Sequence, residues 1–504
     1  MTVVHGTDPR TGAPVPATVE DTSEAELDRR VAAAVEAGRQ LAGRTLGARA
    51  SLLRAIADAL DADTAELVAI ADSETALGVP RLTGELARTS AQLRLFAAAV
   101  EEGSFLEAIV DHPDPGATPP RPDLRRILQP LGPVAVFSAS NFPFAFSVAG
   151  GDTASALAAG CPVVVKAHSA HPATSAATAA AVARGLDTAG APAALHQVVY
   201  GRSAGNALVS HPDVRAVGFT GSTAGGRALF DRAAARPTPI PFYGELGSVN
   251  PVVVLPGAAA NRPAELADGF AASLVLGVGQ FCTNPGLVFA PESLAPALAR
   301  AVGASTGGPM LTERMRTSYD EEVGARDRRS DVRAVATGSP GEGAFAVAPR
   351  LHQTTLARFR AALDVLVEEC FGPAALVVTY PDDAPGELLG VLADLPGSLT
   401  GTVHADAEDL DTVGRVAAVL RGNAGRLVFN GWPTGVAVSW AQHHGGPYPA
   451  TTAPLHTSVG VTAVRRWLAP VTYQDWPDAL LPEALQESNP LAIPRRYDGV
   501  LGTR

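Results

Sequence analysis

The chain has 504 residues, of which 46% are hydrophobic and 18% charged, and its formal net charge is −12. This length favours roughly two to four domains with large apolar cores. The acidic balance and the absence of Lys/Arg runs longer than pairs argue against a nucleic-acid groove, and no apolar run reaches the roughly 18 residues of a membrane span.

The three cysteines indicate a reducing compartment. Cys161, Cys282 and Cys370 carry no C-x-x-C spacing and are too few for a disulfide framework, so we expect reduced thiols and no metal site. The opening MTVVHGTDPRTGAPVP lacks the basic and apolar regions of a secretory signal. These features predict a cytoplasmic protein with a small-molecule ligand, no nucleic-acid partner and no membrane.

The predicted elements begin with a helical layer. Apolar residues recur at helical spacing from Ser23 to Glu102, and the proline-rich stretch DHPDPGATPPRPDLRR, residues 111–126, predicts a connection or an arm. Short buried strands then alternate with helices over residues 131–255, which is typical of a doubly wound parallel sheet. Further helices and strands follow over residues 264–428.

Two later segments are distinctive. The stretch ERMRTSYDEEVGARDRRSDVRA, from Glu313, is dense in both signs of charge, which indicates a solvated helical face. The tail RWLAPVTYQDWPDALLPEALQESNP, from Arg466, combines an apolar strand with proline-punctuated helix. Its Trp and Leu residues predict an interface.

Ligands of parallel sheets bind beyond the carboxyl ends of the strands. Four such turns carry polar residues: SASN after VAVF, KAHS after PVVV, TGSTAGG after AVGF, and GVGQFC after the apolar run SLVL, which we expect to be a strand. A G-x-G-x-x-G fingerprint is absent from these turns, but Thr220, Gly221 and Ser222 can bind phosphate through backbone N–H groups at a helix start.

Lys166 is the only lysine among 39 basic residues. An ammonium is a compact point charge, whereas a guanidinium is a wide planar fork, so a pocket built for one does not accept the other. Chance survival of one lysine in an arginine-rich composition is the alternative explanation.

Six ordered motifs resemble the aldehyde dehydrogenase superfamily over essentially the whole length: SNFPFAFS, VVVKAHSAHP, GFTGS, GELG, GQFCT and EECFGP. The segments GELGSVNP, GWPTGV and HGGPYPATT are most similar to the NADP-dependent 2-oxoglutarate semialdehyde (2,5-dioxovalerate) dehydrogenases. The resemblance implies an α/β fold with a Rossmann-like cofactor domain, an α/β catalytic domain and a small β oligomerisation arm.

The resemblance also implies a mechanism. Cys282 would attack the aldehyde, its own backbone N–H and the amide of Asn141 would hold the oxyanion, and Glu245 would activate the water that hydrolyses the thioester. Glu369 and Phe371 of EECFGP would bind the cofactor. Thiol chemistry supports this independently, because cysteine is the side chain most nucleophilic near neutral pH.

The cofactor expected is NADP, with NAD possible. In the resembled family the lysine corresponding to Lys166 binds the adenosine ribose or its phosphate, and NAD-selective members tend to have Glu where Ser169 stands. A hydroxyl there removes repulsion of a 2′-phosphate, and Arg202 is placed to pair with it.

The expected substrate is a small aldehyde, 2-oxoglutarate semialdehyde, whose far carboxylate calls for arginine or several donors. Candidates are Arg121, Arg125 and Arg126 of RPDLRR and the hydroxyls of Thr452, Thr457 and Ser458, with surface or interface charges as the alternative for the arginines. The segment TTAPLHTSVG, where relatives tend to have a more polar, Arg-containing run, departs from the pattern.

The resemblance implies a subunit in three parts: a cofactor domain (1–111 and 131–247), a catalytic domain (248–455), and an oligomerisation arm and tail (112–130 and 465–504). An arm of this kind leaves an unpaired strand edge, so a homodimer or homotetramer is expected.

Several alternatives remain open. They are an aliphatic or fatty aldehyde dehydrogenase, a dehydrogenase that acylates coenzyme A, a non-catalytic binding or structural protein, and a thiol hydrolase. Glu245 favours hydrolysis over transfer to coenzyme A. The thiol hydrolase is disfavoured because no histidine stands in a motif with Cys282, and the pair His443 and His444 resembles a substrate-side loop.

Overall fold

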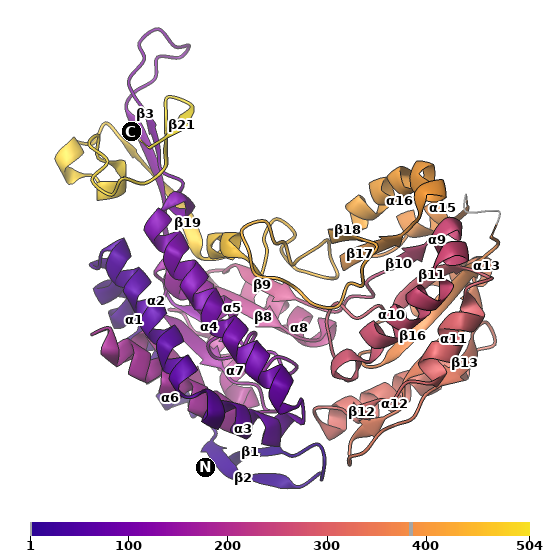
Figure 1. Cartoon of the computed structure of the whole chain (residues 1–504). Helices are drawn as coiled ribbons and strands as arrows, with labels where there is room; N and C mark the ends of the chain where they lie inside the picture. The colour runs from indigo at the N-terminus through magenta and orange to yellow at the C-terminus, as the bar shows by residue number, and fades with distance from the viewer. Residues whose placement is uncertain (1–2, 383–386, 504) are drawn as a thin grey trace.

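The predicted helical layer is present in the structure, a computed structural model that describes residues 3–382 and 387–503 (Figure 1). Ser23 and Thr45 each begin a helix by accepting a backbone N–H, from Glu26 and Ala48 respectively. The helices are α1 (Glu24–Ala42), α2 (Leu46–Ala62), α3 (Thr64–Thr75) and α4 (Val79–Glu102). A hairpin of β1 (Val3–Thr7) and β2 (Pro14–Glu20), which the sequence analysis did not predict, precedes them.

The first sheet is parallel and, within the described residues, five-stranded, with the order β7-β6-β5-β8-β9. One face packs on α1 and α7, and the other packs on α5 and α6, with α2 and α4 outside them. The elements are β5 (Val134–Phe137), α5 (Gly151–Ala159), β6 (Val163–Lys166), α6 (Pro172–Thr188), β7 (His196–Val199), α7 (Arg202–Ser210), β8 (Ala216–Thr220), α8 (Thr223–Ala234) and β9 (Phe242–Glu245). The doubly wound prediction is confirmed for these elements.

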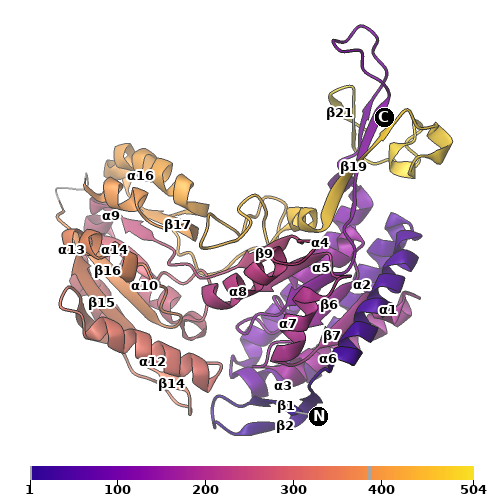
Figure 2. The ribbon, with the colours of Figure 1, turned by 180° about the vertical axis from the view of Figure 1, so that it is seen from behind.

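The second sheet forms the other lobe of the molecule (Figures 1 and 2). In the described part of the chain it has seven strands in the order β13-β15-β16-β11-β10-β17-β18, all parallel except β13. Its strands are β10 (Val252–Val254), β11 (Leu287–Pro291), β13 (Arg333–Thr337), β15 (Arg350–Thr355), β16 (Ala374–Tyr380), β17 (Ser398–His404) and β18 (Ala424–Phe429). Because β10 belongs here, the expectation that one doubly wound unit extends to residue 255 was wrong.

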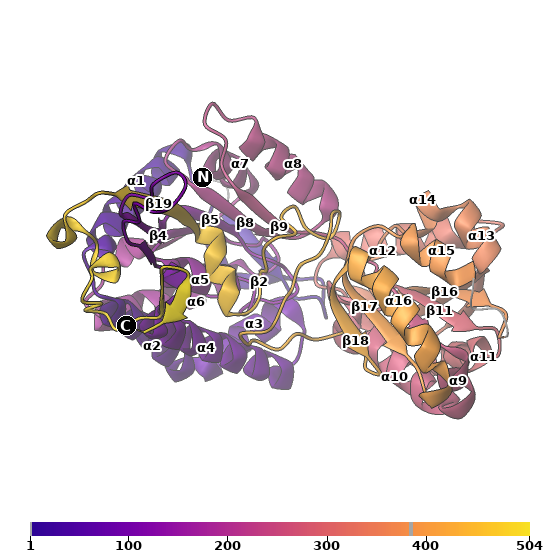
Figure 3. The same cartoon turned by 90° about the horizontal axis from the view of Figure 1, so that it is seen from above.

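Helices cover both faces of this second sheet. One face carries α9 (Pro256–Asn261), α10 (Pro263–Val275) and α11 (Ala295–Gly303), and the other carries α13 (Leu356–Ala361), α14 (Leu363–Leu366), α15 (Leu388–Ala393) and α16 (Leu410–Asn423). Helix α12 (Glu313–Asp327) follows the two-residue strand β12 (Gly308–Pro309), which pairs with β14 (Ala346–Val347). Figure 3 shows the two lobes from above.

The arm projects from the first lobe (Figures 1 and 2). Its sheet has the order β19-β4-β3-β20-β21, built from β3 (Ile109–Asp111), β4 (Leu124–Pro130), β19 (Leu468–Gln474), β20 (Arg495–Tyr497) and β21 (Val500–Gly502). The tail therefore returns to pair with the proline-flanked segment: Ala469 of β19 is the partner of Gln129 of β4, which lies 340 residues earlier in the sequence. Residues 1, 2, 383–386 and 504 of the predicted ranges lie outside the described residues.

Over the residues that the structure describes, no helix combines the length and apolar character needed to cross a membrane.

Candidate active site

The loop that carries Cys282 follows a helix. The run SLVL, which we expected to be a strand, ends α10, so that expectation was wrong. Gly277, Val278 and Gly279 then turn the chain through three consecutive left-handed conformations, with φ of 56°, 59° and 65°. A side chain on Gly279 would collide with the backbone of Gly372, so the two glycines allow this loop to lie against the FGP turn. Cys282 is left partly exposed.

Cys282 faces a cavity of about 500 Å³. Nine of the eleven site residues predicted from the sequence line it: Asn141, Ser169, Thr220, Gly221, Ser222, Glu245, Cys282, Glu369 and Phe371. The cavity runs between the carboxyl ends of the first sheet and the second lobe, and its volume is typical of ligand sites.

Asn141 is buried beside the nucleophile loop. Its side-chain Nδ2 donates a hydrogen bond to the backbone carbonyl of Gln280 over 2.8 Å. The backbone carbonyl of Asn141 accepts a hydrogen bond from Nη2 of Arg81 over 2.7 Å. Since an amide nitrogen carries two hydrogens, one remains for an oxygen near Cys282.

A histidine joins the two other predicted catalytic groups. Nε2 of His444 lies 3.4 Å from Sγ of Cys282, and its Nδ1 lies 2.9 Å from Oε2 of Glu245. Burial alone would lower the pKa of His444, but the charges of Cys282 and Glu245 and its hydrogen bonds to both raise it to about 10. The three side chains form one hydrogen-bonded chain, with His444 and Glu245 buried and Cys282 partly exposed, that can move a proton.

The HGGPYPATT segment brings His444 to this position. It runs beside β9, where Leu246 N–H donates to the carbonyl of Ala450 over 2.8 Å, and Glu245 forms a β-bridge with Thr451. The backbone N–H of His444 donates to Oγ1 of Thr457. This role was not predicted from the sequence, because His444 stands 162 residues from Cys282 and in none of its motifs.

The hydroxyls proposed for substrate binding have structural partners instead. Oγ1 of Thr457 accepts from His444, Oγ of Ser458 lies 3.2 Å from Nδ1 of His444, and Oγ1 of Thr452 accepts the N–H of Gly244. They are not among the residues that line the cavity, so their contribution is to fix His444 and β9.

The arginines of RPDLRR lie in the arm. Arg121 contacts Asp498, while Arg125 is buried with Asp123, Asp478 and the carbonyl of Leu485. Arg126 belongs to β4. None of these three candidates lines the cavity, so the structure favours the alternative interpretation, in which they are surface or interface charges.

Lys166 and Arg202 do not line the cavity but lie beside its first-sheet end. Lys166 ends β6, next to Val199 of β7, and Arg202 begins α7. Burial lowers the pKa of Lys166, Asp21 raises it and Arg202 lowers it. Among the described residues, no side-chain hydrogen bond or salt bridge holds the ammonium of Lys166, which suits a site for a bound anion or hydroxyl.

Asp21 is a further charged group here, and the sequence did not predict it. The residue after it, Thr22, exchanges two hydrogen bonds with Tyr200, of 3.1 and 2.9 Å, which hold the chain after β2 against the YGRSAG turn. A side chain on Gly201 would collide with the Asp21 carboxylate. Oδ1 of Asp21 is buried and has no hydrogen-bond partner within the described residues.

The start of α8 can bind phosphate. Ser222 caps the helix, with Oγ accepting the N–H of Gly225 over 3.3 Å, and Thr220, Gly221 and Ser222 line the cavity. A side chain on Gly226 would collide with Leu246, so glycine lets the helix start approach β9 closely. Together with Lys166, these residues fit a nucleotide with phosphate groups.

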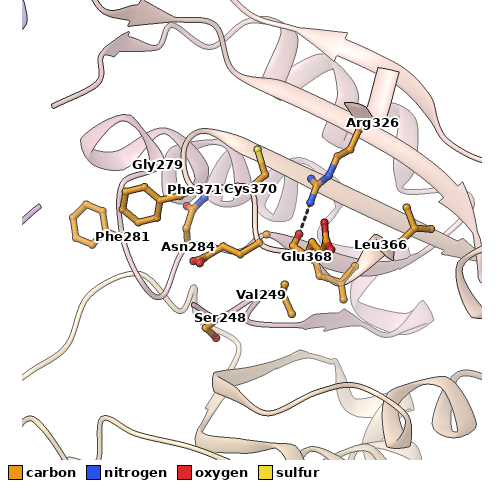
Figure 4. A pocket seen from close by; sticks show the side chains of 13 residues that line it. Ser248, Val249, Gly279, Phe281, Asn284, Arg326, Leu366, Glu368, Cys370 and Phe371 are labelled. Carbon is orange, nitrogen blue, oxygen red and sulfur yellow. Dashed lines mark hydrogen bonds between the residues drawn. The ribbon is translucent and has the colours of Figure 1, made fainter. Parts of the chain in front are cut away.

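Glu369 also lines the cavity and borders the smaller space shown in Figure 4. Burial raises its pKa to about 8, the N–H of Ser248 opposes this, and Glu322 adds to it. In the same region Nη2 of Arg326 donates to the carbonyl of Glu368 over 2.8 Å, which holds the EECFGP turn on α12.

Helix α12 is only partly a solvated face. Arg314, Met315, Ser318 and Glu322 line the cavity, although the helix carries the charged residues that predicted exposure. The prediction of a fully solvated face was therefore incomplete, because one side of the helix closes the cavity between the lobes.

Comparison with known proteins agrees with this geometry. The chain is 48% identical over 501 residues to alpha-ketoglutaric semialdehyde dehydrogenase 2 of Azospirillum brasilense, covering 98% of this chain and 95% of that protein. It is 42% identical over 484 residues to alpha-ketoglutaric semialdehyde dehydrogenase of Acinetobacter baylyi, with coverages of 94% and 91%.

A solved structure is similar over 95% of both chains with a TM-score of 0.79 at 22% identity: aldehyde dehydrogenase C of Pseudomonas syringae with NAD+ and octanal. This likeness shows the fold. The aldehyde dehydrogenase family model matches residues 2–447. The chain belongs to the aldehyde dehydrogenase family and is an aldehyde dehydrogenase.

Proposed function

We propose that the protein oxidises 2-oxoglutarate semialdehyde to 2-oxoglutarate with NADP, through a thioester on Cys282. The substrate rests on the two relatives, whose names contain the same compound under its older name, alpha-ketoglutaric semialdehyde. The observation that carries the chemistry is the contact of Cys282 with His444 and of His444 with Glu245, inside a cavity that continues to Ser222.

In this proposal the thiol of Cys282 has passed its proton to Nε2 of His444 before the aldehyde binds, and the thiolate sulfur bonds to the aldehyde carbon. The new oxyanion is bound by the free N–H of Asn141 and the backbone N–H of Cys282; one such donor typically contributes about 10²–10³ in rate. When bound, NADP supplies the acceptor for the hydride that leaves this carbon. The resulting thioester is hydrolysed by water whose proton passes to Glu245, which releases the carboxylic acid and the thiol.

The cofactor would be held by groups from three turns. The phosphates would meet the start of α8 at Ser222, and the ribose end would meet Lys166, Ser169 and Arg202. Lys166 and Arg202 are two positive charges beside the single negative charge of Asp21, so this corner favours an anion such as a 2′-phosphate.

Kinetic comparison of substrates tests the proposed function. The values of kcat/KM for 2-oxoglutarate semialdehyde, succinic semialdehyde and pentanal, each with NADP and NAD, are measured by the absorbance of the reduced nicotinamide. We expect the oxo-acid semialdehyde with NADP to be preferred. Preference for pentanal would instead support the aliphatic alternative, which the rings of Phe142 and Phe146 in the cavity wall also suit.

Replacing Ser169 by glutamate is expected to shift the cofactor preference from NADP towards NAD by about 10- to 100-fold. The new carboxylate would repel a 2′-phosphate and accept a hydrogen bond from a 2′-hydroxyl. The ratio of kcat/KM values for the two cofactors measures the shift. Asp21→Asn is the matched control of opposite sign, since it removes a negative charge from the same corner and should increase the preference for NADP. If neither change alters the ratio of the kcat/KM values for NADP and NAD, residues other than Ser169 and Asp21 determine the cofactor preference.

We further propose that the arm joins two or more copies of this chain. β19 is an edge strand, and Trp476 and Leu480 beyond it are 50% and 66% exposed. An unpaired edge next to exposed apolar side chains favours association. Sedimentation equilibrium is expected to give a dimer or tetramer, and a monomer at micromolar concentration would refute the role of the arm.

A further inference from the structure

Helix α4 carries a row of charges on the side that faces the nucleophile loop. Arg81, Glu85 and Arg88 are spaced by four and three residues, which puts them on one face of the helix. Glu85 is buried, and its Oε1 accepts the N–H groups of Phe144 and Ala145 over 2.8 and 3.0 Å. The row therefore packs directly against the SNFPFAFS segment.

Positive charge exceeds negative charge in this row. Burial raises the pKa of Glu85, while the backbone N–H of Ala145 and the charge of Arg81 lower it. If Glu85 is ionised the three groups carry one net positive charge, and if it is neutral they carry two. A buried excess charge is costly unless an anion accompanies it.

The two guanidinium groups are unequally satisfied. Nη2 of Arg81 donates to the carbonyl of Asn141, although its Nη1 is buried without a partner in the described residues. Within the same part of the chain, Arg88 has no side-chain hydrogen bond or salt bridge, and its Nε is buried and unpartnered. Arg88 thus has its full set of donors available.

Arg88 is not among the residues that line the cavity, but it contacts two aromatic rings that are. Its Cζ lies 5.4 Å from the ring centre of Phe146 and 5.9 Å from that of Phe142, and both phenylalanines line the cavity with Cys282. Cation–π contact with these two rings stabilises the charge of the guanidinium away from bulk water. Arg88 is also close enough to Cys282 for their charges to interact.

Another arginine near Cys282, Arg426, already uses its donors in hydrogen bonds within the protein. Arg426 of β18 also interacts with the charge of Cys282, but its Nη1 and Nη2 donate to the carbonyls of Gly435 and Pro433 over 2.9 and 2.6 Å. Its hydrogen bonds stabilise the GWPTGV segment. Of these residues, Arg88 combines free donors, aromatic support and proximity to the nucleophile.

We propose that Arg88 binds the carboxylate of the substrate, with Arg81 adding positive charge behind it, and so selects short aldehydes that end in a carboxylate. This inference rests on the proposed function and names the group that would give its substrate preference. A planar guanidinium binds a carboxylate through two parallel hydrogen bonds, so Arg88 would orient the substrate as well as attract it.

The test compares 2-oxoglutarate semialdehyde with pentanal, which has the same number of carbons but no carboxylate. We expect Arg88→Gln to lower kcat/KM for the semialdehyde by about 10²-fold, the size of a lost charged hydrogen-bonded contact, and to change that for pentanal by less than about threefold. Arg88→Lys should restore part of the loss. Arg94→Gln is the matched control, because Arg94 lies on the same helix but pairs at the surface with Asp58 and Asp61.

A second measurement does not depend on the folding of a variant. In the wild-type protein without cofactor, phenylglyoxal modifies accessible arginines, and peptide mapping identifies them. Glutarate should protect Arg88 from this reagent and should slow alkylation of Cys282, whereas pentane-1,5-diol should do neither.

The outcomes separate the two proposals. If wild-type protein prefers pentanal, the proposed substrate is wrong. The wild-type protein can instead prefer the semialdehyde while Arg88→Gln lowers kcat/KM equally for both substrates, or while glutarate fails to protect Arg88. Either result would show that the carboxylate site is elsewhere, and the proposed function would stand.

Discussion

Replacing Glu245 by glutamine is expected to leave a burst of NADPH in the first turnover and to slow steady turnover by about 10²–10⁴-fold, the usual contribution of a general base. An amide cannot accept the proton of the attacking water, so the thioester on Cys282 accumulates. Rapid-mixing absorbance measures the burst, and mass spectrometry of the quenched protein measures the acylated Cys282.

The same change tests whether Glu245 also acts through His444. The glutamate contacts Nδ1 of His444 over 2.9 Å, so its removal should slow the burst as well as the later turnover. Glu369→Gln is a comparison within the same cavity, since Glu369 contacts neither Cys282 nor His444 and should not cause acyl-enzyme to accumulate. Full steady-state turnover of Glu245→Gln would remove Glu245 from the hydrolytic step.

Replacing His444 by glutamine is expected to abolish the burst and to lower kcat by about 10²-fold. The thiol of Cys282 then lacks the base at 3.4 Å that takes its proton, so formation of the thioester becomes the slow step. The alkylation of Cys282 by iodoacetamide at pH 7 should slow by about 10-fold, because the thiolate is the reactive form.

The neighbouring residue provides the control for this variant. His443→Gln changes the same residue type one position away, in a half-buried side chain with no contact to Cys282, and should keep the burst. A His444→Gln protein with normal alkylation and a normal burst would show that the contact in the structure is not used.

The pKa of His444 also predicts a dependence of stability on pH. Because folding raises this pKa from about 6.5 to about 10, the stabilisation is complete below pH 6.5 and is lost as the pH rises through 10. The difference in Tm between wild type and His444→Gln should therefore shrink over this window, measured by scanning calorimetry. A difference that grows with pH would contradict the charged state of His444.

The sequence predicted the parts of the site that local motifs carry. Asn141, Ser222, Glu245 and Cys282 stand in short segments with characteristic neighbours, and the structure brings them to one cavity. The helix at SLVL was misassigned because a short apolar run has the same composition in a buried strand and in a buried helix.

Residues positioned by long-range packing were missed. His444 reaches Cys282 because its segment pairs with β9, and Asp21 reaches Lys166 because the chain after β2 pairs with Tyr200. The residues adjacent to His444 and Asp21 in the sequence do not predict these long-range contacts. Arg88 is similar, since its spacing from Glu85 predicts only a helix face and not which loop that face covers.

Val278 shows how the nucleophile loop is held in place. A β-branched residue with φ of 59° is rare and costs about 1–3 kcal/mol, so glycine at this position would relieve backbone strain. Its side chain packs towards Gly308 and the cluster around Met310 and Tyr319. Val278→Gly would relieve this strain but would also remove the packing and free the backbone next to Cys282, so a less fixed sulfur and a lower catalytic rate are its expected consequences.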